Sequence, residues 1–262
     1  MRSFDLMPFQ KWILEHNRDL EIQDPCLPAL LDADWKNLAK NISSILDGYT
    51  GRMGVHGPFF GINIGAFDAK IQQVIRDRML QALEFAEFIG GTHMVIHSPF
   101  NPFGNAFLNL GSSHKMVIDA AHQCLKDAVK TAEAMGCTIV IENIHDKNPA
   151  PLLELVQSFE SDFVKMSLDT GHAMIMHKMG GGPTPDQWAA AAGNLLGHIH
   201  IQDTDGMDDR HWAPGRGQIN FFPLFEQIKS LENTPRLILE MDNMEWILEG
   251  NQHLVDQGLI LH

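Results

Sequence analysis

Six short apolar segments of this sequence each end on a residue that can bind a metal ion or transfer a proton. In chain order, the six residues are His56, His97, Glu142, Asp169, His200 and Glu240. Each segment has the length of a buried strand and contains β-branched residues. The carboxyl ends of parallel strands meet at one face of a barrel, so we expect these side chains to converge on one site.

A divalent cation would stabilise such a set of side chains. One histidine at a strand end is more often a hydrogen-bonded core or rim residue, and one carboxylate there is more often a helix cap or an ion-pair partner. Six such residues in series favour a shared ligand. Carboxylates crowded into a partly desolvated site repel one another, at a cost of roughly several kcal/mol. A bound cation removes that repulsion, and neutral imidazoles complete its ligands. The oxygen and nitrogen donors, without cysteine, suit Mn²⁺, Mg²⁺, Co²⁺ or Zn²⁺ and do not select among them.

Two neighbouring segments add candidates for substrate or metal binding. His172 follows Asp169 by three residues and could bind a substrate hydroxyl or a second metal. The segment 209–217, DRHWAPGRG, could bind an anionic or polyhydroxylated ligand through side chains and backbone N–H groups; the alternative is an ordinary surface loop. Its candidate residues are Asp209, Arg210, His211 and Arg216.

An alternation of strand and helix patterns predicts the architecture. The strand candidates are 2–6, 20–24, 52–57, 93–98, 138–143, 163–169, 197–202 and 236–241. Helical periodicity is strong at two segments, 68–89 and 113–135. It is weaker at 8–17, 34–47, 149–159, 185–194, 221–231 and 243–249. Eight such units predict an α/β fold, a single (β/α)8 TIM barrel that forms one domain over 1–262.

An open doubly wound sheet is the alternative architecture. No GxGxxG follows the first strand candidate, and no GxxxxGK[ST] occurs in the chain, which excludes the common nucleotide-binding versions of that sheet.

Composition narrows the classes of partner. The net charge of −14 argues against broad binding to nucleic acid, although a local site stays open. No apolar run approaches the ~20 residues of a membrane span, and the N-terminus lacks the apolar stretch of a secretion signal. We therefore expect a cytoplasmic protein without membrane contact. Cys26, Cys124 and Cys137 are widely spaced without a CxxC pair, and Cys124 and Cys137 are expected to be buried thiols.

Five motifs resemble the xylose isomerase-like TIM barrel superfamily, which includes sugar isomerases and epimerases and the metal-dependent apurinic endonucleases. The resemblance extends over about residues 50–245. It depends on IEN at 141–143, LDTGH at 168–172, HIHIQD at 198–203, DRHWAPGRGQINF at 209–221 and LILEM at 237–241.

The two branches of this superfamily imply different ligand sets. The sugar epimerase branch implies one metal held by Glu142, Asp169, His200 and Glu240, with His172 and an arginine near 210 or 216 on the substrate. The endonuclease branch implies three metals, and this chain also matches its additional ligands at His56, His97, His172, Asp209 and His211.

Three departures from the motifs bear on the choice of branch and substrate. The chain reads ENIHD after the 138–143 strand and DTGHAM at 169–174, and both depart from the endonuclease pattern and favour the sugar branch. The usual GEG turn is Gly215-Arg216-Gly217 here, a charge reversal that favours an acidic or phosphorylated substrate.

We predict a divalent-metal-dependent isomerase or epimerase of a ketose or ketose phosphate, with proton transfer through an enediolate. Glu142 and Glu240 would serve as acid and base as well as metal ligands. Residues expected to contact the substrate are His56, His97, His172, Arg210 and Arg216.

Three alternatives remain open at this point. They are phosphodiester hydrolysis at abasic DNA, a metal-assisted dehydratase or lyase, and a barrel that binds a sugar or a metal without turnover. The oligomeric state is also open, because the apolar segment 99–110 could be either a lid or a contact within a homo-oligomer.

Overall fold

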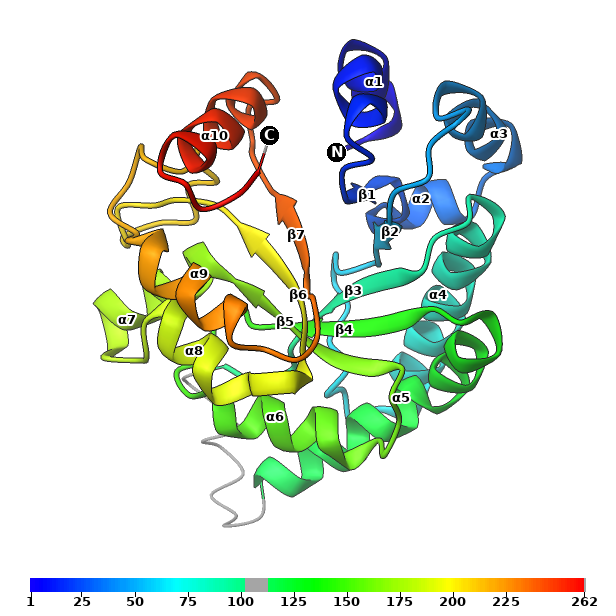
Figure 1. Cartoon of the computed structure of the whole chain (residues 1–262). Helices are drawn as coiled ribbons and strands as arrows, with labels where there is room; N and C mark the ends of the chain where they lie inside the picture. The colour runs from blue at the N-terminus through cyan, green and yellow to red at the C-terminus, as the bar shows by residue number, and fades with distance from the viewer. Residues whose placement is uncertain (102–112, 262) are drawn as a thin grey trace. The chain divides into compact units, whose positions relative to one another are not determined.

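A computed structural model describes residues 1–101 and 113–261 of the chain (Figure 1). The described residues form two compact units of alternating strands and helices. The first contains residues 1–99, 113–141 and 157–164, and the second contains 142–156 and 165–261, together with 100–101. The assignment of 1–262 to one domain stays a prediction.

The strands of the first unit follow one another in chain order. They are β1 (Leu20–Ile22), β2 (Met53–His56), β3 (His93–His97) and β4 (Thr138–Glu142), whose last residue belongs to the second unit. β1 pairs with β2 and β2 with β3, both in parallel. Val55, Ile96 and Ile139 are each fully buried, as expected for parallel strands that are covered on both faces.

Two long helices of the first unit confirm the strongest helical patterns. They are α4 (Ala69–Phe88) and α5 (Ser113–Met135), which pack against each other. The Asp68 side chain accepts hydrogen bonds from the first-turn N–H groups of α4, so it caps the helix. Gly90 and Gly136 follow the two helices with positive φ angles, the conformation that ends a helix. The shorter helices are α1 (Leu6–Glu15), α2 (Pro28–Leu31) and α3 (Lys36–Ile45).

The second unit contains β5 (Val164–Asp169), whose first residue belongs to the first unit, β6 (Leu196–Ile201) and β7 (Arg236–Leu239), which pair in parallel in this order. In this register Asp169 is the partner of His200, so two candidate ligands lie side by side. The helices that follow β4 and these strands are α6 (Pro149–Ser158), α7 (Thr170–Gly180), α8 (Pro185–Ala192), α9 (Phe221–Lys229) and α10 (Glu245–Asp256).

The predicted strand at 2–6 is wrong. Ser3–Asp5 form a 3-10 helix, η1, that leads directly into α1. The backbone N–H and the hydroxyl of Ser3 both donate to the buried Asp24 carboxylate at 2.7 Å, and this side-chain partner, 21 residues along the chain, replaces a sheet ladder. Phe4 is 71% exposed although Leu6 is fully buried, so these two apolar side chains do not share one buried face as they would in a strand. The described residues therefore contain seven strands where the sequence predicted eight.

Two smaller predictions have clear outcomes. Cys124 and Cys137 are buried thiols outside any disulfide, as expected, and the same holds for Cys26. Within the described residues, no helix combines the length and the hydropathy that a membrane crossing requires. Residues 102–110 of the predicted lid or subunit contact lie outside the described residues.

Candidate metal centre

Four of the six predicted strand-end residues form one buried cluster in the second unit. Each offers a ligand atom, and these atoms lie within 4.8 Å of one another. His200 Nδ1 is central, 2.8 Å from Glu142 Oε1 and 3.1 Å from Glu240 Oε2. The first cluster consists of Glu142, Asp169, His200 and Glu240.

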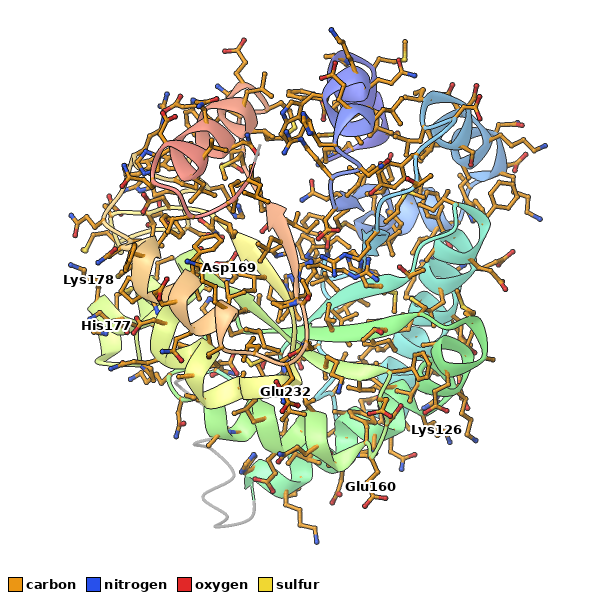
Figure 2. All side chains as sticks on the ribbon, in the orientation of Figure 1. Lys126, Glu160, Asp169, His177, Lys178 and Glu232 are labelled. Atoms are coloured by element: carbon orange, nitrogen blue, oxygen red, sulfur yellow. The ribbon has the colours of Figure 1, made fainter. Side chains whose placement is uncertain are left out.

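The first cluster is built from the ends of successive strands. Glu142 ends β4, Asp169 ends β5, His200 is the penultimate residue of β6, and Glu240 directly follows β7. Figure 2 labels Asp169 where β5 gives way to α7. Glu240 is held by a hydrogen bond from its own N–H to the carbonyl of Ile201 on β6. Rigid strand ends therefore position all four side chains.

Asp169 lies in an environment that disfavours its charged form, and a bound cation would offset this cost. Burial, together with the charges of Glu142 and Glu240, raises its pKa to about 6, although His172 opposes this shift. The side chain also accepts a 2.6 Å hydrogen bond from the N–H of His172, so it caps α7. Three carboxylates and an imidazole in a buried space are a donor set that fits a divalent metal ion.

A second cluster lies in the same unit and consists of His172, Asp209 and His211. Asp209 Oδ2 lies 3.2 Å from the Nε2 atom of each imidazole. His172 is further fixed by Nδ1, which is 3.0 Å from the carbonyl oxygen of Asn143. The three residues come from the first turn of α7 and from the segment after β6.

In the second cluster, the Asp209 carboxylate pairs with the imidazoles of His172 and His211. Burial favours the neutral form of His211, but the Asp209 hydrogen bond and the charge of Glu240 outweigh it and raise the pKa to about 9. Burial acts in the same way on His172, yet Asp169 and Asp209 raise its pKa well above the usual value. For Asp209 itself, the two imidazoles overcome burial and hold the pKa well below its usual range. These three residues therefore favour a carboxylate flanked by two imidazolium groups in the absence of a metal.

Two buried residues of the site were not predicted. Gln202 follows His200 by two residues and contacts Asp169, Asp209 and His211. The strand alternation of HIHIQD places Gln202 on the face of His200, and this was the signal that could have identified it.

Asp203 is the second such residue, and it organises the segment 209–217. Its carboxylate accepts hydrogen bonds from the N–H groups of Gly215, Gly217 and Ile219 at 2.9–3.0 Å. A Cβ at Gly217 would lie 2.4 Å from Asp203 Oδ1, so only glycine fits this turn. The glycine turn therefore binds a carboxylate of the protein itself.

His56 and His97 lie in the first unit, at the ends of β2 and β3. Their ring centroids are 5.2 Å apart, and the ring of Phe59 stacks on His97 at 4.5 Å. The Pro-Phe turn after His56 thus packs an aromatic ring against these imidazoles. Their roles in substrate or metal binding stay predictions.

The two predicted substrate-binding arginines are engaged with carboxylates. Arg210 pairs with Asp205 at 3.1 Å and with Asp208 at 3.3 Å. Arg216 makes two 2.7 Å hydrogen bonds to Glu249 and lies over the ring of Trp246. Because Glu249 balances the charge of Arg216, the argument for a phosphorylated substrate from this residue is weaker than the sequence suggested. Substrate contact by either arginine stays a prediction.

A model of the family described as xylose isomerase-like TIM barrel matches residues 20–259. The chain belongs to this family. The predicted fold class, an α/β TIM barrel, is thereby confirmed, and so is the resemblance read from the motifs.

The individual relatives and solved structures that resemble this chain share about a quarter of its residues or fewer. An uncharacterized protein of Methanocaldococcus jannaschii is 26% identical over 229 residues, which cover 84% of this chain and 74% of that protein. A crystal structure named D-tagatose 3-epimerase-like protein is 25% identical, with a TM-score of 0.77 and coverage of 94% and 90% of the two chains. A Thermus thermophilus protein, from a crystal soaked with ZnCl2, is 23% identical with a TM-score of 0.74 and coverage of 98% and 97%.

Proposed function

We propose that this protein is a divalent-metal-dependent isomerase or epimerase of a ketose or ketose phosphate. The observation that carries the proposal is the convergence of three carboxylates and one imidazole, all buried or nearly so, on a single point. The similarity to a D-tagatose 3-epimerase-like protein supports a sugar as the substrate class.

The residues that would hold the metal are Glu142, Asp169, His200 and Glu240. A cation bound there would supply Lewis-acid polarisation of a substrate carbonyl and its neighbouring hydroxyl.

Glu142 and Glu240 are the acid and base of the proposed reaction. Glu142 ends β4 and Glu240 follows β7, and both approach Nδ1 of the same histidine, His200, at 2.8 and 3.1 Å. One carboxylate removes the proton from the carbon beside the carbonyl, which leaves an enediolate. The other donates a proton to the opposite face for epimerisation, or to the neighbouring carbon for isomerisation. Two groups are required because one carboxylate does not reach both faces of a planar intermediate.

Isotope exchange tests this proposal directly. Wild-type protein loaded with Mn²⁺ and incubated in D₂O with a panel of ketoses and ketose phosphates should incorporate deuterium at the carbon beside the carbonyl of its substrate. Glu142→Gln and Glu240→Gln should each lower turnover by about 10²–10⁴-fold. Glu226→Gln, an exposed residue of α9 paired with Lys229, is the matched control and should retain activity. Full activity of Glu142→Gln would refute the assignment.

The same assay separates a dehydratase or lyase from an isomerase. β-Elimination also begins with proton removal, but it ends with a product that has lost water or another leaving group, which mass spectrometry of the products detects.

Phosphodiester hydrolysis at abasic DNA is a second candidate. The observation in its favour is the second cluster, since a multi-metal site suits phosphoryl chemistry. The net charge of −14 opposes binding to a polyanion. Cleavage of an abasic duplex, with no deuterium exchange into any ketose, would select this candidate over the isomerase.

A further inference from the structure

The side chain of Gln202 contacts both clusters. Gln202 directly follows β6 and is fully buried. Its Nε2 lies 3.2 Å from both carboxylate oxygens of Asp169 and 2.9 Å from Oδ1 of Asp209. The two N–H bonds of one amide are thus divided between a carboxylate of the first cluster and a carboxylate of the second.

The orientation of this amide is determined by its other end. Gln202 Oε1 accepts a 2.9 Å hydrogen bond from the backbone N–H of His211. A flipped amide would place its carbonyl oxygen against two carboxylates and its NH₂ group against an N–H donor. The carboxamide therefore has one satisfactory orientation, and in it both carboxylates receive a donor.

Two residues of the segment 169–172, Thr170 and Gly171, hold the backbone of Gln202 and leave space for its side chain. The Thr170 hydroxyl donates to the backbone carbonyl oxygen of Gln202 at 2.7 Å and accepts from the backbone N–H of Gln202 at 3.0 Å. A Cβ at Gly171 would lie 2.4 Å from Cδ of Gln202 and 2.5 Å from its Oε1. Thr170 thus fixes the backbone of Gln202, and Gly171 leaves the space for its amide.

We propose that Gln202 is a positioning residue that prepares both clusters for divalent cations. The proposal depends on the metal-dependent function put forward above. A hydrogen bond to a ligand carboxylate fixes the direction of its remaining lone pairs, and loss of such a bond typically lowers metal affinity by about 10–100-fold. Because the amide serves Asp169 and Asp209 together, its loss weakens both sites rather than one.

Calorimetric titration of chelator-treated protein with MnCl₂ tests the proposal, with free Mn²⁺ counted by electron paramagnetic resonance. Wild-type protein should bind one ion per cluster, two in all. Gln202→Ala should weaken both sites by about 10–100-fold. Gly171→Ala should weaken both sites as well, because the new methyl group displaces the amide, and Gly171→Ala/Gln202→Ala should be no weaker than Gln202→Ala alone. If Gln202→Ala fails to fold, Gln202→Met keeps the side-chain volume and removes the donors.

Matched controls exist for both substitutions. Gln218 is exposed in the segment after β6, and Gln218→Met should leave both affinities unchanged. Gly180 also lies in α7, where a Cβ would meet only the flexible end of Lys147, so Gly180→Ala should bind as the wild type does.

Three results would overturn the proposal. They are weakening of one site only by Gln202→Ala, unchanged affinity at both sites, and additive effects of the Gly171 and Gln202 substitutions. In each of these the wild type still binds Mn²⁺, so the proposed metal-dependent function survives. Wild-type protein that binds no Mn²⁺ would instead contradict that function and this proposal together.

Discussion

The two clusters of the second unit differ in how the chain positions them. The first takes its four residues from the ends of β4, β5, β6 and β7, and its members are buried or nearly so. The second takes Asp209 and His211 from an irregular segment, and the Asp209 side chain is 43% exposed. The sheet therefore positions the first cluster, to which the Gln202 amide adds a hydrogen bond. The second cluster depends on the same amide and on the glycine turn whose N–H groups donate to Asp203. This difference suggests that the first cluster keeps its shape when the second is disturbed.

The largest effect is expected from His200→Ala. This substitution removes the imidazole at the centre of the first cluster and leaves Glu142 and Glu240 to repel each other in a buried space. Turnover should fall by more than about 10³-fold, and the first site should lose its metal. Metal analysis by mass spectrometry, combined with the deuterium assay, measures both. Retention of full metal content would show that another set of residues holds the ion.

His211→Ala should produce a smaller and more selective change. It removes one of three ligands of the second cluster and none of the first. We expect one Mn²⁺ fewer per chain, while the affinity of the remaining site changes by less than about threefold. Loss of both ions in this variant would show that the two clusters are a single unit, and the contrast drawn above would be wrong.

Asp203→Asn tests the segment that carries the second cluster. The amide keeps one acceptor oxygen in place of two, so bonds from the N–H groups of Gly215 and Gly217, both to Oδ2, or from Ile219, to Oδ1, are lost. Loss of buried hydrogen bonds should lower the free energy of unfolding by about 1–3 kcal/mol. The second site should weaken more than the first. Chemical denaturation and Mn²⁺ titration give the two values, and equal weakening of both sites would contradict the independent support of the first cluster by the sheet.

The smallest effect is expected from Arg216→Gln. Because Glu249 already pairs with Arg216, we expect KM for an unphosphorylated ketose to stay within about twofold, with kcat unchanged. A rise in KM confined to ketose phosphates would restore the role in phosphate binding that the sequence indicated.

The strand-end ligands could be predicted because a buried strand appears in the sequence as a short apolar segment with a definite end. Glu142, Asp169 and His200 each lie at or near the end of a short segment that alternates or accumulates apolar residues, and the parallel register brings such ends together. The first predicted strand failed because Asp24, far along the chain, satisfies the backbone of Ser3. Asp209 and His211 were recognised from their segment as ligand-binding candidates, but a role as metal ligands came only from the family resemblance.

Helix α7 and the role of Gln202 were missed for a related reason. Asp169 is both a strand end and the cap of α7, and the helix it begins carries little amphipathic pattern. Gln202 has no charge and acts only through groups that lie in other segments. The strand alternation could place Gln202 on the face of His200, but its hydrogen bonds to Asp169 and Asp209 are seen only in the folded chain.

The most direct test of the central claim is a crystal structure grown with MnCl₂, with anomalous diffraction recorded near the manganese edge. We expect an anomalous peak bounded by the carboxylates of Glu142, Asp169 and Glu240 and by Nδ1 of His200. An anomalous map without a peak at these four residues, from crystals in which they are ordered, would contradict the account.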